Sequence, residues 1–165
     1  TLETISNIKP LPGRGEKITI NFKDNKKTFI IDDSYNANPD SMNAALYNFN
    51  NMKQKLENYE SILIIGDMLE LGESSNELHL KLIPIIKKIN PNILITLGIY
   101  TANISKELCS SINCYSYNSV EKLLKDIKKY LKPTQVIFIK GSNGTGLWKL
   151  VPTLIKNIQE EYNAA

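Results

Sequence analysis

The sequence has 165 residues, of which 42% are hydrophobic and 22% are charged, and its formal net charge is +3. This apolar content is enough for the core of one domain, so the composition excludes a disordered chain, and the charge is too small to indicate nucleic-acid binding. No apolar run reaches the roughly 18 residues that a membrane span needs. Two cysteines, Cys109 and Cys114, fit neither a zinc ribbon nor a disulfide scaffold, so we expect a reducing, cytoplasmic setting. Because the sequence begins with Thr1 and not Met, we expect it to be part of a longer chain.

Strand-like and helical patterns follow one another along the chain. The first two strands, 18–22 and 28–33, flank a polar turn typical of a hairpin and should be antiparallel neighbours. Asn38 can cap, and Pro39 can open, a helix whose apolar residues recur at helical spacing. The other predicted elements are strands at 61–65, 93–97, 114–117 and 135–139, and helices at 76–89, 101–108, 120–131 and from about 147 to 160.

The later strands are short and entirely apolar, as at 62–65 and 136–139. Such runs are typical of parallel strands that helices cover on both faces. The sequence therefore predicts a three-layer, Rossmann-like α/β domain, with a mostly parallel sheet of about six strands and an antiparallel strand at its N-terminal side. Residues 1–16, which contain two prolines and two glycines, are interpreted as a linker that enters a domain of residues 17–163.

Polar residues stand at the carboxyl ends of four predicted strands, where open parallel sheets bind ligands. They are Asp32 to Asn36, Gly66-Asp67, Thr96 to Gly98, and Lys140 to Ser142. The residues from Asn38 to Ser41 are explained by helix capping, but Asp33 has no such local role and is assigned to function. Arg14 is the only arginine among 20 basic residues. A single arginine indicates a site that needs a planar guanidinium with several N–H donors, although chance explains its presence equally well.

The glycine-rich segment 140–146 has the spacing of a phosphate-binding P-loop, from Gly141 to Gly146. Leu147 and Trp148 follow where that motif needs Lys and Ser or Thr, so a Walker A loop is excluded. Anion binding and a plain tight turn remain equally good explanations.

The segment 66–73 places Asp67, Glu70 and a third acid in a loop before a helix, which Ser74 or Ser75 can cap. The roles of Asp67 and Glu70 stay open at this point. His79, the only histidine, has no cysteine or second histidine as a partner for a metal site. We interpret it as a packing or helix-surface residue.

A response-regulator receiver domain is an alternative from another class. A receiver domain has an acid pair, an acceptor aspartate, a threonine and a lysine at successive strand ends. The residues of the same types in this chain are, in that order, Asp32-Asp33, Asp67, Thr96 and Lys140. The match is incomplete, because Asp67 ends the very next strand after Asp33 and an extra antiparallel strand leads in.

Four ordered motifs resemble the C-terminal domain of the Mur ligase family, in its D-alanyl-D-alanine-adding (MurF) branch. They are Gly13-Arg-Gly-Glu16, the Ile31–Met42 string with Tyr-Asn-Ala-Asn-Pro-Asp-Ser, the Ile65–Glu73 string with Gly-Asp-Met-Leu-Glu-Leu-Gly, and Lys140-Gly-Ser142. The resemblance spans nearly the whole chain.

This resemblance implies a domain of an ATP-dependent amide ligase of bacterial peptidoglycan synthesis, and so of cell-wall biogenesis, cell shape and cell division. The carboxylate of UDP-MurNAc-tripeptide becomes an acyl phosphate, which the amine of D-Ala-D-Ala attacks. Arg14 then acts at the ATP phosphates as the catalytic residue, Asp33 holds the ribose, and Asn36 and Asn38 lie beside the nucleotide. The substrate-binding residues are Asp67, Glu70, Lys140 and Ser142.

The resemblance also predicts what this chain lacks. The phosphate loop and the Mg²⁺ ligands of the family belong to a central domain, so no metal site is expected here and the isolated domain should be inactive. We expect a monomer whose partners are its own N-terminal and central domains. Asn143 stands where the pattern usually has arginine, which puts recognition of the dipeptide carboxylate there in question. Another Mur or folylpolyglutamate-type amide ligase is the remaining alternative.

Overall fold

The computed structural model describes residues 11–162. Six strands form one sheet in the order β1-β2-β6-β3-β4-β5, with β1 antiparallel to β2 and all other neighbours parallel. This confirms the predicted α/β sheet, including its antiparallel strand at the N-terminal side. The strands are β1 (Glu16–Asn21), β2 (Lys27–Asp33), β3 (Glu60–Gly66), β4 (Ile93–Leu97), β5 (Asn113–Tyr117) and β6 (Gln135–Lys140).

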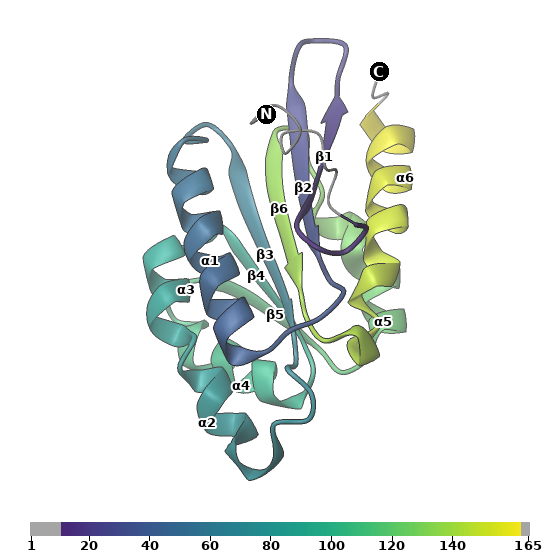
Figure 1. The fold of residues 1–165 in the computed structure, drawn as a ribbon. Helices are drawn as coiled ribbons and strands as arrows, with labels where there is room; N and C mark the ends of the chain where they lie inside the picture. The colour runs from purple at the N-terminus through teal and green to yellow at the C-terminus, as the bar shows by residue number, and fades with distance from the viewer. Residues whose placement is uncertain (1–10, 163–165) are drawn as a thin grey trace, which may run out of the picture.

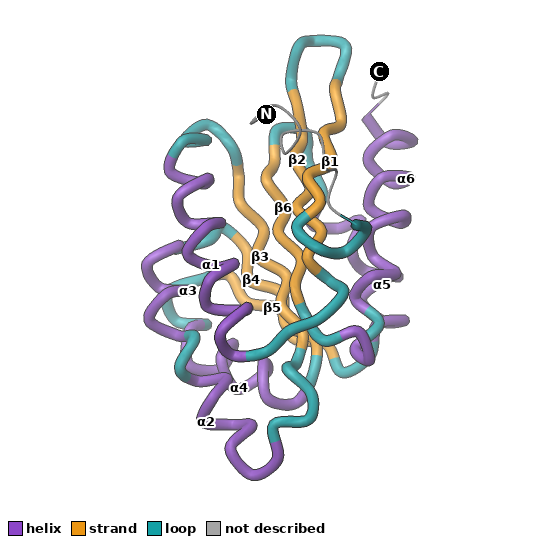
Figure 2. The backbone as a smooth tube through the Cα atoms, viewed as in Figure 1, coloured by secondary structure: helices purple, strands orange, loops and turns teal. Residues whose placement is uncertain are grey.

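Helices cover both faces of the sheet, as Figures 1 and 2 show. One face carries α1, α2, α3 and α4, and the other carries α5 and α6. Their bounds are α1 (Pro39–Gln54), α2 (Ser75–Leu80), α3 (Ile83–Ile89), α4 (Ile99–Leu108), α5 (Val120–Asp126) and α6 (Leu150–Tyr162). None of the helices among residues 11–162 has the length and apolar character needed to cross a membrane.

Each central strand contributes to two separate cores. In β3, Ile62 and Ile64 face α5 and α6, whereas Leu63 and Ile65 face α1 and α3, and all four side chains are fully buried. Successive side chains of a strand point to opposite faces, so a strand covered on both sides must be apolar throughout. This is the physical reason for the uninterrupted apolar runs in the sequence.

The structure corrects several predicted helices. The helix expected at 76–89 is two helices, α2 and α3, because Pro84 stands in the first turn of α3 and has no N–H to bond the preceding turn. The helix expected at 120–131 changes to a 3₁₀ turn at Ile127–Tyr130, and a 3₁₀ turn at Leu147–Lys149 precedes α6. Glu16, placed in the linker, already begins β1.

Capping was predicted correctly for one helix and wrongly for another. Asn38 caps α1, with its Oδ1 accepting from the Ser41 amide at 2.8 Å while Ser41 Oγ accepts from the Asn38 amide at 3.0 Å. Ser74 gives no such bond to α2. Ser75 instead donates its hydroxyl to the carbonyl of Gly72 at 2.7 Å, which closes the preceding 3₁₀ turn.

Candidate functional site

The loops that follow β2, β3, β4 and β6 meet at one edge of the sheet, and the segment before β1 joins them. The amide of Gly15 donates to the Asp32 carbonyl at 2.8 Å, and the Tyr35 amide donates to the Gly13 carbonyl at 2.9 Å. Gly13 has a φ of +75°, and a Cβ there would lie 3.1 Å from Tyr35 Cβ. Because only glycine suits this position, the sequence Gly-Arg-Gly fixes Arg14 beside the carboxyl end of β2.

Arg14 presents an exposed cation at this corner. Its guanidinium carbon lies 4.3 Å from the centre of the Tyr35 ring, a cation–π contact that holds the guanidinium plane without using its N–H donors. Within residues 11–162 it makes no ion pair. The donors therefore remain available for an anionic ligand.

Asp32 and Asp33 point to opposite faces of β2 and differ in chemistry. Asp32 is buried, and its Oδ1 accepts from both the amide and the hydroxyl of Ser34, at 3.1 and 2.5 Å, so it fixes the turn after the strand. Asp33 pairs in register with Lys140 of β6, and its Oδ2 lies 2.7 Å from Lys140 Nζ. Asp33 Oδ1 has no hydrogen bond to any residue of 11–162, and the side chain is 22% exposed. One carboxylate oxygen is thus open to a ligand.

Lys140 itself is almost inaccessible. Its side chain is 3% exposed, and Nζ also donates to the carbonyl of Asn36 at 3.0 Å. The ammonium therefore ties the loop after β2 to the end of β6. Asn36 and Asn38 are exposed in that loop, where Asn36 Oδ1 accepts from the Ala37 amide at 2.8 Å. Their amide NH₂ groups donate to no residue within 11–162.

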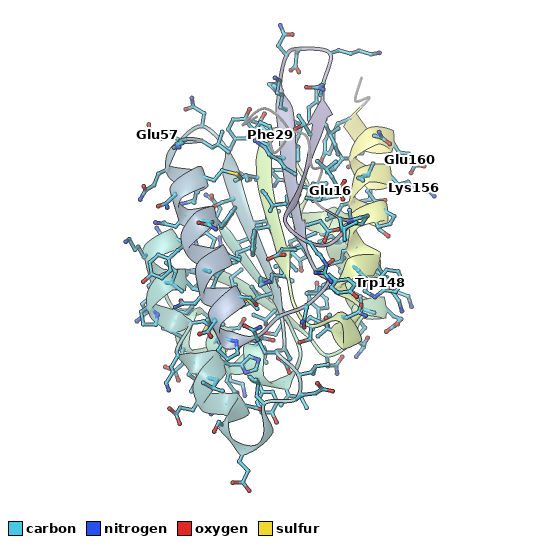
Figure 3. All side chains as sticks on the ribbon, in the orientation of Figure 1. Glu16, Phe29, Glu57, Trp148, Lys156 and Glu160 are labelled. Carbon is cyan, nitrogen blue, oxygen red and sulfur yellow. The ribbon has the colours of Figure 1, made fainter. Side chains whose placement is uncertain are left out.

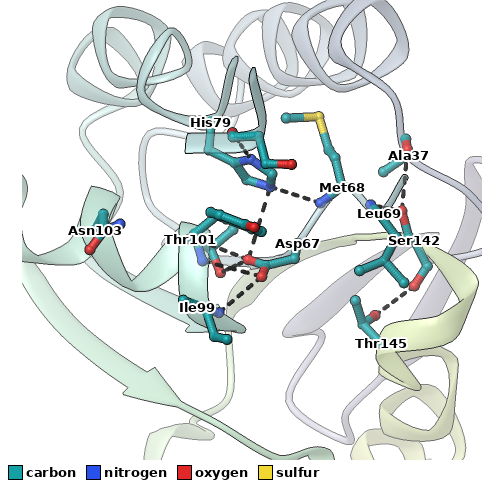
Figure 4. A network of polar contacts seen from close by, with 12 residues as sticks. Ala37, Asp67, Met68, Leu69, His79, Ile99, Thr101, Asn103, Ser142 and Thr145 are labelled. Carbon is teal, nitrogen blue, oxygen red and sulfur yellow. Dashed lines mark hydrogen bonds and ion pairs between the residues drawn. The ribbon is translucent and has the colours of Figure 1, made fainter. Parts of the chain in front are cut away.

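Asp67 caps the helix that starts after β4, as Figure 4 shows. Its Oδ2 accepts from the amides of Ile99 and Tyr100, at 2.9 and 3.2 Å, and its Oδ1 accepts from the amide and hydroxyl of Thr101, both at 2.8 Å. The carboxylate stabilises the positive end of α4 and starts that helix earlier than predicted. Gly98 permits this approach, because a Cβ there would lie 2.2 Å from Asp67 Cγ.

Ser142 joins three loops through one hydroxyl and one amide. Its Oγ accepts from the Leu69 amide at 2.9 Å and donates to the Ala37 carbonyl at 3.3 Å, and its own amide donates to the Asp67 carbonyl at 3.2 Å. Glu70 stands next to Leu69 and is exposed, with a left-handed φ of +63° that is unusual outside glycine. The structure thus brings the four predicted substrate residues to one edge, but only Glu70 is openly accessible.

His79, interpreted from the sequence as a packing or helix-surface residue, makes specific contacts that the sequence did not indicate. It is completely buried, which excludes the helix-surface interpretation and leaves packing. Nε2 accepts from the Met68 amide at 2.8 Å, so Nδ1 carries the proton and donates to the Ser75 carbonyl at 2.6 Å. Nε2 also lies 3.9 Å from Asp67 Oδ1, but in this tautomer it has no proton to share with that carboxylate. A lone histidine gives no sequence signal for a bond to a loop eleven residues away.

An apolar groove runs beside the Arg14 corner, between the segment before β1 and α6. It has a volume of about 590 Å³ and is lined by Tyr35, Trp148, Val151 and Ile155 among others. Trp148 and Glu16, both labelled in Figure 3, belong to this lining. A smaller cavity of about 210 Å³ lies on the other side of β2, against Asp33 and Phe49. The corner is therefore flanked by hollows on both faces of the sheet.

The receiver alternative is not supported. Receiver domains order their parallel strands 2-1-3-4-5, whereas this sheet is β1-β2-β6-β3-β4-β5. Asp67, which would have to be an open phospho-acceptor, is 6% exposed and occupied by the start of α4. Asp32 and Asp33 also do not form a common acid pair, because their side chains lie on opposite faces of the sheet.

Comparison with known proteins identifies the family of the chain. Residues 13–143 match the family described as "Mur ligase, glutamate ligase domain". The UDP-N-acetylmuramoyl-tripeptide–D-alanyl-D-alanine ligase of Rickettsia prowazekii is 36% identical over 148 residues, which cover 89% of this chain and 31% of that protein. The ligase of the same name from Bacillus subtilis is 30% identical over 132 residues, 78% of this chain and 28% of that protein. The chain thus spans about three tenths of the length of these relatives.

Solved structures share the fold. A MurF structure from Acinetobacter baumannii superposes with a TM-score of 0.72 at 22% identity, covering 93% of this chain and 33% of that one. The MurF ligase of Thermotoga maritima in complex with ADP gives 0.66 at 20% identity, covering 97% and 34%. Because the family match extends over most of the described residues and includes the Arg14 corner, the chain belongs to the Mur ligase family and forms its C-terminal, glutamate ligase domain.

Proposed function

We propose that this chain is the C-terminal module of an ATP-dependent ligase that joins D-Ala-D-Ala to UDP-MurNAc-tripeptide in the cytoplasm of a bacterium, during peptidoglycan synthesis. The names of the curated relatives support this assignment, and so does the family match. Since the chain spans about three tenths of those relatives, the N-terminal and central parts of a longer protein would supply the main ATP cradle and the Mg²⁺ ligands. No group of three His, Cys, Asp or Glu side chains that could hold a metal gathers within residues 11–162.

The observation that carries the proposal is the character of the edge where the loops meet. Large apolar side chains are exposed after four strands: Tyr35 after β2, Leu69 after β3, Ile99 after β4 and Trp148 after β6. Their exposed fractions range from 44 to 77%. An apolar rim of this kind around polar side chains is typical of a surface that another domain covers. We infer that the edge closes over a nucleotide and a peptide substrate held by the central domain.

The nucleotide corner consists of Arg14, Asp33, Asn36 and Asn38. ATP would supply the phosphoryl group that activates the substrate carboxylate. Arg14 would donate two parallel hydrogen bonds to phosphate oxygens and offset the charge that develops there, which its stacking on Tyr35 leaves it free to do. Asp33 would accept from ribose hydroxyls through its open Oδ1, while Oδ2 stays on Lys140. The amides of Asn36 and Asn38 would lie beside the nucleoside.

The dipeptide side would be formed by the loops after β3 and β6. Glu70 is exposed there and is available to the ammonium group of an amino substrate. Asp67, Lys140 and Ser142 would shape these loops, because their polar atoms are already engaged with neighbouring loops and helices.

The test requires the longer protein that carries this domain. Arg14→Lys should lower turnover by about 100-fold or more, the scale of losing a preorganised donor at the transition state. Lys17→Ala is the matched control, because Lys17 makes a similar cation–π contact, 4.3 Å from the Phe29 ring, away from the edge. Near-normal turnover of Arg14→Lys would contradict the proposed role.

Three further measurements complete the test. Asp33→Ala should raise the KM for ATP more than the KM for the dipeptide, and an unchanged KM for ATP would remove the ribose assignment. Offering D-Ala-D-Ala alongside glutamate, alanine and a diamino acid separates this ligase from its sister enzymes. The 165-residue chain alone should show no ligase activity.

A further inference from the structure

The loop after β3 is held at three successive amides by three different elements. The amide of Asp67 donates to the end of β4 at 3.1 Å. The next amide, of Met68, donates to His79 Nε2 on α2, and the amide of Leu69 donates to Ser142 Oγ after β6. Figure 4 shows the last two of these bonds converging on the loop. The exposed residues Leu69 and Glu70 therefore lie at, or directly after, three backbone amides that all have acceptors.

His79 is the least replaceable of these partners. Both of its ring nitrogens are in use, and its ring stacks on Tyr100 of α4 with a centroid distance of 5.2 Å. The ring is fully buried, so water cannot take over the Met68 amide if the acceptor is lost. A buried amide without an acceptor is strongly unfavourable, so the loop would have to move to bring the amide to another acceptor.

The loop that His79 holds carries the residues assigned to the dipeptide side. Leu69 packs against the glycine loop after β6, because a Cβ on Gly144 would lie 2.7 Å from Leu69 Cδ1. Glu70 follows directly in its left-handed conformation. None of the hydrogen bonds or ring contacts of His79 involves a residue of the nucleotide corner.

We propose that His79 is a positioning residue for the amino substrate: its neutral Nε2 fixes the Met68 amide and so places Leu69 and Glu70 at the dipeptide side of the ligase. This inference rests on the proposed function. It predicts an effect on the use of D-Ala-D-Ala that is separate from the use of ATP, since the two sides meet different loops.

Two conservative variants separate the two hydrogen bonds of the ring. His79→Gln can return an acceptor near the position of Nε2, whereas His79→Asn can return only the donor near Nδ1. The first measurement is amide hydrogen exchange by NMR on the 165-residue chain. In His79→Asn the amides of Met68 and Leu69 should exchange at least 10-fold faster, with the Ile137 amide of β6 as an internal control for global stability. His79→Gln should stay within about 3-fold of the parent chain.

The second measurement is steady-state kinetics of the longer protein. His79→Asn should raise the KM for D-Ala-D-Ala about 10-fold while the KM for ATP changes less than 2-fold, and His79→Gln should restore most of the loss. Equal changes in both KM values, or normal kinetics despite faster exchange at Met68, would overturn the positioning role. Unchanged exchange at Met68 in His79→Asn would overturn it as well. A parent enzyme that does not use D-Ala-D-Ala would instead refute the proposed function, and this substrate assignment with it.

Discussion

Removing Asp33 and removing Lys140 from their ion pair should cost the domain different amounts of stability. The Lys140 side chain is 3% exposed and the Asp33 side chain 22% exposed. Removing the carboxylate leaves a buried ammonium whose remaining partner is the Asn36 carbonyl, and an uncompensated buried charge costs about 3–5 kcal/mol. Removing the ammonium leaves a carboxylate that water reaches, so the loss is about 2 kcal/mol, the scale of its hydrogen bonds. Asp33→Ala should therefore destabilise the domain more than Lys140→Met does.

The double variant adds a sharper test. With both charges gone, the methionine chain fills the space of the lysine stem, and the cost should fall below that of Asp33→Ala alone. This gives a coupling of about 2 kcal/mol between the two positions. The assay is urea unfolding of the 165-residue chain at pH 7, followed by circular dichroism. Lys81→Met, which breaks an exposed pair with Glu77, is the control and should leave the unfolding midpoint unchanged. Additive effects, or a larger loss for Lys140→Met, would refute the reasoning.

Three other perturbations give separate readouts. Gly98→Ala should destabilise the domain by about 3 kcal/mol in thermal unfolding, because the new Cβ meets the Asp67 carboxylate at a φ of +130°; an unchanged Tm would contradict that contact. Thr134→Gly should raise the Tm by about 3 °C, since a β-branched residue is strained at a φ of +65°, and a lower Tm would disprove the strain. Burial raises the pKa of the Cys114 thiol, so at pH 8 iodoacetamide should label the exposed Cys109 first by peptide mass spectrometry. Equal labelling rates at Cys109 and Cys114 would contradict the effect of burial on Cys114.

The layers of the fold follow from local pattern. The apolar run at 62–65 favours a strand covered on both faces, which the structure confirms, and Asn38-Pro39 marks the start of α1 by capping chemistry alone. The sequence could also have predicted the break between α2 and α3, because proline in a helix interior removes a backbone hydrogen bond. It was missed because the apolar periodicity runs through the proline without a break.

The sequence predicts where the site residues lie but not which contacts they make. Their positions at strand ends place Asp33, Asp67 and Lys140 at one edge of the sheet. These positions do not show what each side chain contacts there. Asp67 caps a helix 32 residues further on, and Lys140 meets Asp33 across 107 residues. These contacts depend on the parallel register and the order of the strands, which no local pattern specifies. The hydrogen bond that His79 accepts could not be predicted for the same reason, since it needs the turn that brings α2 back to the loop after β3.

The Ser142 hydroxyl has a consequence for motion. Together with the ammonium of Lys140, it fastens the loop after β2 to the end of β6, and it fastens the loop after β3 to the same point. The corner proposed for the nucleotide and the corner proposed for the dipeptide are thus joined by hydrogen bonds in the parent chain. If the domain closes as proposed, these bonds favour the arrival of both sets of contacts together, and a variant that frees the loop after β3 would uncouple them.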